Sequence, residues 1–221
     1  MIIDAVVVWL DDRDGPDPLS SIGDQPMIAR AVRCLLDARL VERVDVLVPA
    51  ARVRVVESAC RGLPIRVLAG VGSDPVRTHV DQRAGLGSGD GAFVTNSDRI
   101  VLLHEAVRPL APPDLANTVV EAVRAGHPAA APVLPMTDTV KQVDAAGLVV
   151  ASPDREQLRV AQTPVALRAR LVTGPPLRAV ARLVESGVNV HCVPGHPLAF
   201  PIRTAWDLQL ARLLVEPGRS G

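Results

Sequence analysis

Aromatic residues and lysine are scarce in this chain of 221 residues, and tyrosine is absent. Two tryptophans and two phenylalanines are too few rings for a stacking platform that binds single-stranded nucleic acid. Lys141 is the only lysine among the 24 basic residues, so almost every cation is an arginine. Any mechanism that requires two lysines is therefore excluded.

Net charge is also absent, because 24 acidic residues balance the 24 basic ones. A chain of this kind has no overall attraction to nucleic acid or to an anionic membrane. No apolar run reaches the ~18–20 residues that span a bilayer, and the start lacks the basic residues of a secretion signal. Three cysteines, an odd number without a tight cluster, disfavour a disulfide scaffold. We expect a cytoplasmic protein with no nucleic-acid or membrane partner.

Short apolar runs alternate with helical patterns through the first 135 residues. The expected strands are 2–9, 44–48, 65–68, 100–103 and 129–133, and the expected helices are 24–39, 50–60 and 112–125. Such alternation with short connections predicts a Rossmann-like α/β fold, in which helices flank a mostly parallel sheet. Ligands of such sheets bind beyond the carboxyl ends of the strands, here the loops after Trp9, Leu68 and Leu103.

The alternation is interrupted between Thr139 and Ser152, where two short apolar segments flank the turn sequence 144–147. This pattern predicts a β-hairpin that protrudes from the sheet as an arm, which we define as residues 137–155. A two-stranded ribbon is marginally stable alone, so we expect the arm to pack against a second subunit in a homodimer.

Beyond the arm, helical patterns return. The expected helices are 164–172, 177–186 and 205–215, and the expected strands are 188–193 and 198–202. The glycine-dense stretch 85–91 is expected to be a loop. Without an internal repeat or a linker, residues 1–221 are expected to form one domain.

Four segments carry a family resemblance, and they follow one another along nearly the whole chain. They are Val101-Leu-Leu-His-Glu-Ala-Val-Arg-Pro109, the stretch 132–141 with Thr-Asp-Thr-Val-Lys, Arg155 to Pro164 with its Gln-Thr-Pro ending, and the stretch 195–208. In this order they resemble the 2-C-methyl-D-erythritol 4-phosphate cytidylyltransferases. The resemblance implies in-line attack of a sugar-alcohol phosphate on the α-phosphate of CTP, with pyrophosphate as the leaving group and a magnesium ion as cofactor.

The resemblance also implies roles for individual residues. Arg13 and Arg155 would be catalytic, Gly70, Gly72 and Ala106 would bind the nucleotide, Arg108, Thr139, Thr163 and Arg203 would bind the substrate, and Glu105 would hold the metal. Plainer interpretations stay open beside these. Glu105 is equally a loop carboxylate, Arg108 equally pairs with a neighbouring carboxylate, and β-propensity or turn chemistry alone explains the threonines. His79 is assigned no catalytic role.

The chain departs from the family where phosphates would be held. The family's glycine-rich loop after the first strand is replaced by residues 9–19, which have one glycine, four aspartates and no lysine. Four carboxylates repel a triphosphate unless a metal intervenes, and clustered charges of this kind favour a solvated acidic turn. Pro201 stands where the family has a lysine, and Arg203 compensates only in part. We therefore expect an impaired cytidylyltransferase, with an inactive relative that serves as a binding or partner protein as the alternative.

Overall fold

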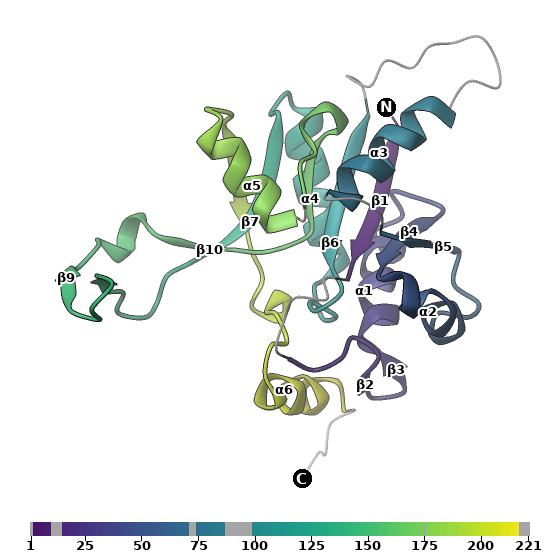
Figure 1. Ribbon diagram of the computed structural model, residues 1–221, viewed down its shortest axis with the longest axis horizontal. Coiled ribbons are helices and arrows are strands. Elements are labelled where there is room, and N and C mark those ends of the chain that lie inside the picture. The colour runs from purple at the N-terminus through teal and green to yellow at the C-terminus, as the bar shows by residue number, and fades with distance from the viewer. Residues whose placement is uncertain (1, 10–14, 71–73, 87–98, 175, 217–221) are drawn as a thin grey trace.

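The computed structural model describes residues 2–9, 15–70, 74–86, 99–174 and 176–216, and their centre is an eight-stranded sheet (Figure 1). Its strands are β1 (Ile3–Val8), β4 (Val44–Val48), β5 (Ile65–Ala69), β6 (Ile100–Glu105), β7 (Ala129–Pro135), β10 (Arg159–Ala161), β11 (Val165–Arg168) and β12 (Val190–Pro194). Their order is β10-β7-β11-β6-β1-β4-β5, and β12 also pairs with β7. Within the described residues, no helix is long and apolar enough to cross a membrane.

The pairing of the strands is mostly parallel, which confirms the predicted fold class. Strands β5, β4, β1 and β6 run parallel to one another, and β12 runs parallel to β7. Strand β11 is antiparallel to both β6 and β7 and separates them. The central strands are almost continuous apolar runs because both of their faces are covered by helices.

Helices cover both faces of the sheet, and alternate residues of each strand pack against the helices of one face or the other. Val7 of β1 faces a core built with α1 (Met27–Asp37), α2 (Val53–Ala59) and α4 (Pro113–Arg124). Val6 faces the opposite core, built with α3 (Pro75–Leu86) and α5 (Pro176–Glu185). Successive side chains of a strand point to opposite faces, so each apolar run serves both cores.

A smaller apolar cluster lies beyond the carboxyl ends of the strands. It joins helix α6 (Ala205–Val215) to the short hairpin of β2 (Ser21–Ile22) and β3 (Gln25–Pro26), with Ile202 and Ala211 in its centre. Figure 1 shows α6 and this hairpin side by side below the sheet. The loop that follows β6 therefore has a packed layer against it.

The arm is a hairpin of β8 (Gln142–Val143) and β9 (Val149–Ala151), and it extends away from the sheet (Figure 1). The Asp144 side chain accepts hydrogen bonds from the backbone N–H groups of Ala146 and Leu148, both at 2.9 Å, and so forms the turn. The predicted hairpin is confirmed. Its role in dimerisation stays a prediction.

Three sequence-based assignments were wrong. The expected helix 164–172 is strand β11 followed by a single 3-10 turn, η3 (Ala169–Leu171), because hydrogen bonds to β6 and β7 hold Val165–Arg168 extended. The expected strand 198–202 begins as another 3-10 turn, η4 (Pro197–Ala199). Helix α3 was not predicted, and it continues into the glycine-dense stretch assigned to a loop. Further 3-10 turns are η1 (Ala50–Arg52) and η2 (Arg155–Gln157).

Candidate active site

Strands β1, β5 and β6 end at one edge of the sheet, where the loops that follow them begin. The backbone N–H of Trp9 donates to Leu47 at 3.0 Å, and that of Gly70 donates to Val48 at 2.8 Å. The N–H of Ala106 donates to the last residue of β1 at 3.0 Å. These bonds extend the ladder past the strands and bring two predicted nucleotide-binding residues, Gly70 and Ala106, to the carboxyl edge where a ligand is expected.

A buried chain of hydrogen bonds occupies the end of β6. His104 Nε2 lies 3.1 Å from the carbonyl oxygen of Arg108, and Nδ1 lies 2.9 Å from Thr163 Oγ1. Because a carbonyl only accepts, the proton of the neutral imidazole is on Nε2, and the threonine hydroxyl donates to Nδ1. Thr163 Oγ1 in turn accepts from the N–H of Glu105 at 3.3 Å. The hydroxyl predicted to contact substrate is thus engaged within the protein.

His104 is held in its neutral form by this surrounding. Burial chiefly, and the Arg108 cation in addition, lower the pKa of His104 from its ordinary 6.5 to about 4. At neutral pH the imidazole therefore carries no charge, and it fixes the loop that carries Arg108. His104 lies within the motif 101–109, but no role was predicted for it from the sequence.

Glu105 and Arg108 form a buried ion pair. Arg108 Nε donates to Glu105 Oε2 at 2.9 Å. Its Nη1 donates to the carbonyl of Ala199 at 2.5 Å, and Nη2 donates to that of Ala161 at 3.4 Å. Three nitrogens of the guanidinium thus donate to acceptors within the protein, one carboxylate and two backbone carbonyls. Pairing with a neighbouring carboxylate is the interpretation that the sequence left open, and substrate binding by Arg108 stays a prediction.

Glu105 is also the residue to which the family resemblance assigns the magnesium ion. Among the residues described, no group of three His, Cys, Asp or Glu side chains is placed to hold a metal ion. Magnesium requires near-octahedral oxygen ligands, and a single carboxylate already paired with a guanidinium supplies too few. The described residues do not fit a magnesium site around Glu105. Asp11, Asp12 and Asp14, three of the four aspartates that follow β1 in the sequence, lie outside the described residues.

The Gln-Thr-Pro segment follows β10, and its glutamine forms hydrogen bonds with the loop before η4. The Gln162 side chain makes two hydrogen bonds of 2.9 Å with the backbone of His196, one as donor and one as acceptor. Gly195 lies so close that a Cβ there would collide with Gln162 Oε1 and would lie 2.9 Å from the carbonyl oxygen of Val133. Sequence reasoning missed Gln162 and Gly195, although Gln162 directly precedes Thr163 in the quoted motif.

The described part of the loop after β1 packs against its surroundings. Gly15 approaches the backbone of Arg203, since a Cβ would lie 2.8 Å from that carbonyl oxygen. Asp17 pairs with Arg52 at 3.4 Å, and the Arg52 guanidinium lies 5.2 Å from the centre of the Trp9 ring. One of the four aspartates is thus neutralised by an arginine from another loop.

The remaining predicted residues are Arg13, Gly72, Thr139, Arg155 and Arg203. Arg13 and Gly72 lie outside the described residues. Thr139 and Arg155 are exposed in the arm, where Arg155 Nη1 donates to the carbonyl of Thr137 at 3.4 Å. Arg203 is exposed just before α6. The structure therefore brings Glu105, Ala106, Arg108 and Thr163 together and leaves the arm residues exposed.

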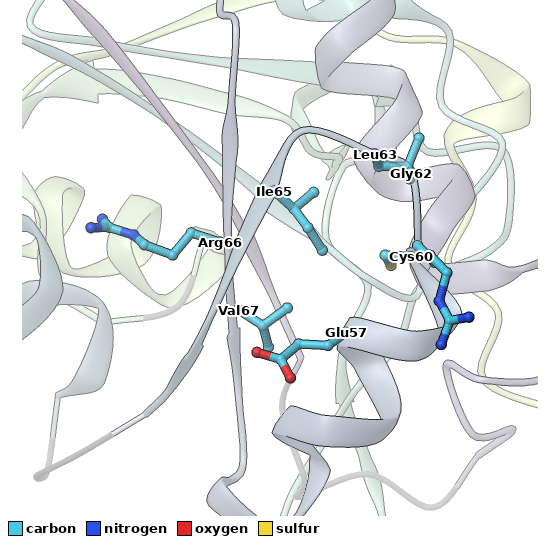
Figure 2. A pocket seen from close by; sticks show the side chains of 8 residues that line it. Glu57, Cys60, Gly62, Leu63, Ile65, Arg66 and Val67 are labelled. Atoms are coloured by element: carbon cyan, nitrogen blue, oxygen red, sulfur yellow. The ribbon is translucent and has the colours of Figure 1, made fainter.

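A separate hollow of about 370 Å³ lies between α2 and β5 (Figure 2). Burial raises the pKa of the Cys60 thiol in its wall to about 11, so that the thiol is neutral at pH 7. Arg66 points away from the other labelled side chains in Figure 2 and binds Asp45 through two hydrogen bonds of 3.1 and 2.9 Å. Asp45 also lies 2.9 Å from His79, so His79 serves this buried cluster.

Comparison with known proteins shows the family of this chain. The sequence matches the family model of 2-C-methyl-D-erythritol 4-phosphate cytidylyltransferase over residues 12–217. The chain belongs to this family. A cytidylyltransferase of Nocardia farcinica (strain IFM 10152) is 43% identical over 211 residues, which cover 91% of this chain and 86% of that protein. The corresponding protein of Rhodococcus jostii (strain RHA1) is 41% identical over 210 residues, which cover 92% and 88%.

Solved structures agree on the fold. The 2-C-methyl-D-erythritol 4-phosphate cytidylyltransferase of Thermus thermophilus superposes with a TM-score of 0.68 at 23% identity, covering 97% of this chain and 98% of that one. A 4-diphosphocytidyl-2C-methyl-D-erythritol synthase superposes with a TM-score of 0.75 at 21% identity, again covering 97% and 98%. The resemblance inferred from four short segments is therefore confirmed at the level of family and fold.

Proposed function

We propose that this member of the cytidylyltransferase family transfers the cytidylyl group of CTP to 2-C-methyl-D-erythritol 4-phosphate, at a rate far below that of an enzyme with the complete motifs. The observation that carries the proposal is the 43% identity, over 91% of the chain, to a relative with that name. The site would be the carboxyl edge formed by the loops after β1, β5 and β6. A cytoplasmic location is part of the same proposal.

The reaction joins two phosphates and therefore needs positive charge. A phosphate oxygen of methylerythritol phosphate attacks the α-phosphorus of CTP, the bond from that phosphorus to the bridging oxygen breaks, and pyrophosphate leaves. Arg108 and Arg203 are the described arginines that the proposal places near the phosphates, with Arg155 supplied by the arm of a second subunit. Arginine suits this task because its planar fork binds two phosphate oxygens at once.

The homodimer belongs to the proposal because the arm is unsupported within one chain. The arm has four large exposed apolar side chains, namely Val143, Leu148, Val149 and Val150. An isolated hairpin does not bury such surface, whereas a second subunit would. The arm of one protomer would then present Thr139 and Arg155 to the site of its partner.

Three features support a low rate. The Arg108 charge is already compensated by Glu105 at 2.9 Å. Pro201 supplies neither a side-chain cation nor a backbone N–H. The loop after β1 begins with aspartates in place of glycines. Loss of one preorganised donor commonly costs about 10²–10³ in rate, so we expect a rate at least about 10³-fold lower, or about 4 kcal/mol of lost transition-state stabilisation.

Magnesium enters the proposal only through residues that are not described. Around Glu105 the donor set does not fit the ion, so we assign no step to it there. If the ion binds, Asp11 and Asp12 would be its ligands. Calorimetric titration of CTP with and without magnesium, repeated on Asp11→Ala and Asp12→Ala, tests this directly, since a magnesium-dependent affinity lost in both variants would establish the ligands.

The alternative is an inactive relative that binds a partner, and the closed Glu105–Arg108 pair favours it. The test is pyrophosphate release from CTP and methylerythritol phosphate at saturating concentrations, with magnesium or manganese. Arg155→Ala should abolish any genuine activity, and the matched variant Arg159→Ala, an exposed arginine at the start of β10, should leave it unchanged. Turnover near an ordinary ~10 per second that Arg155→Ala abolishes would contradict the impairment. No turnover and no CTP binding would favour the alternative.

A further inference from the structure

Helix α6 is apolar on two opposite sides. Leu208, Ala211 and Val215 face the cluster around Ile202 and Ile22. The other side is exposed, with Trp206 76% accessible, Leu213 66%, Leu214 50% and Leu210 40%. We call this second set, Trp206, Leu210, Leu213 and Leu214, the α6 stripe.

The α6 stripe is one continuous surface. Trp206, Leu210 and Leu213 are spaced by four and three residues, which places them on one side of a helix across two turns. The helix is fixed in place by a capping box, in which Thr204 Oγ1 accepts from the N–H of Asp207 at 3.1 Å and Asp207 accepts from the N–H of Thr204 at 2.8 Å. A surface helix normally shows a polar outer side. A rigid exposed apolar side that carries a tryptophan is typical of a binding surface.

We propose that the α6 stripe packs antiparallel against the α6 stripe of a second copy of this chain, around a two-fold axis beside Leu210. Charge favours this occupant. Arg203 is exposed just before the helix, and Glu216 is exposed just after it. An antiparallel pair places Arg203 opposite Glu216 of the second copy, whereas a parallel pair places like charges together.

The apolar residues select the same register. The pair of Trp206 with Leu213 and the pair of Arg203 with Glu216 are both centred between residues 209 and 210. One two-fold axis therefore satisfies both pairs, and it places Leu210 beside its own copy. Such a self-complementary patch is the requirement of an isologous interface.

This interface is distinct from the arm. Figure 1 shows α6 beyond the carboxyl ends of the strands, and the arm extends from the edge of the sheet near β10. The two surfaces are therefore made of different residues. With the arm unpaired the α6 interface gives a dimer, and with the arm paired it joins two arm dimers. The inference does not depend on catalysis.

The first test is the mass of the full chain by sedimentation velocity at micromolar concentration. Trp206→Glu and, separately, Leu213→Glu should halve the particle mass or raise the dissociation constant about 30-fold or more, because each places a charge in the apolar contact between Trp206 and Leu213. Glutamate at position 206 suits the first turn of a helix, so the fold should survive, and circular dichroism checks that it does. The matched control Ala205→Glu, exposed on the same helix but on the side away from the stripe, should keep the wild-type mass. An unchanged mass in both stripe variants would overturn the proposal.

The second test addresses the register. Arg203→Glu alone and Glu216→Arg alone each place like charges together and should weaken association. The double variant Arg203→Glu/Glu216→Arg restores opposite charges and should recover the wild-type dissociation constant. Failure of the double variant to recover it, while both single variants weaken association, would overturn the antiparallel register.

Discussion

Acidification should destabilise this protein through His104. The pKa of His104 is about 4 in the folded chain and 6.5 in an ordinary histidine, so the unfolded chain binds a proton more readily between these values. The free energy of unfolding therefore falls as the pH drops below about 6.5, and the loss is complete below about pH 4. The full loss corresponds to about 3 kcal/mol, of which about 2 kcal/mol is reached at pH 5.

The measurement compares the wild type with His104→Gln, whose side chain does not titrate. Urea unfolding at pH 8 and pH 5 gives the free energy of unfolding of each protein, and the difference between the two pH effects isolates His104. The variant should be less stable at pH 8 by about 1–2 kcal/mol because the bonds to Arg108 and Thr163 change. It should also lose about 2 kcal/mol less than the wild type on going to pH 5. Equal losses in both proteins would refute the reasoning.

Three further expectations concern packing and assembly. Glu105→Gln removes the carboxylate 2.9 Å from Arg108 Nε and should lower the free energy of unfolding by about 3 kcal/mol in a urea titration, with a loss below about 1 kcal/mol contradicting the buried pair. Gly195→Ala places a Cβ against Gln162 and should lower the melting temperature measured by calorimetry by several degrees. An unchanged melting temperature would mean that the loop moves without cost and would contradict the close packing. Replacement of residues 140–150 by a short Gly-Ser turn should halve the particle mass in sedimentation, and a mass equal to that of the wild type would exclude the arm as an interface.

The central strands were predictable because their signal is local. The runs 5–8 and 100–103 are apolar at successive positions, as strands buried on both faces require. Strand β11 was not predictable in this way. Its four residues follow Pro164 and fit a short helix equally well, and only pairing with two strands distant in sequence decides between the two structures.

In the site, too, contacts between residues close in sequence were predictable and contacts between distant residues were not. Glu105 and Arg108 are three residues apart, so the sequence alone allowed their pairing as an open alternative. The bond between His104 and Thr163 joins residues separated by 59 positions, and no local pattern reports it. The family resemblance implied a substrate-binding role for Thr163, which stays a prediction, and gave no sign that its hydroxyl bonds to His104.

The place of β11 between β6 and β7 has a consequence for the order in which the chain folds. During synthesis, β6 emerges from the ribosome well before residues 165–168, and until these arrive its outer edge has no partner in the final sheet. The same segment also pairs with β7, so one edge of β6 and one edge of β7 remain unpaired until this short segment is synthesised. Open strand edges template association with other chains. The nascent protein is therefore most exposed to misassembly between the completion of β6 and the arrival of β11, an interval of about 60 residues or several seconds of translation.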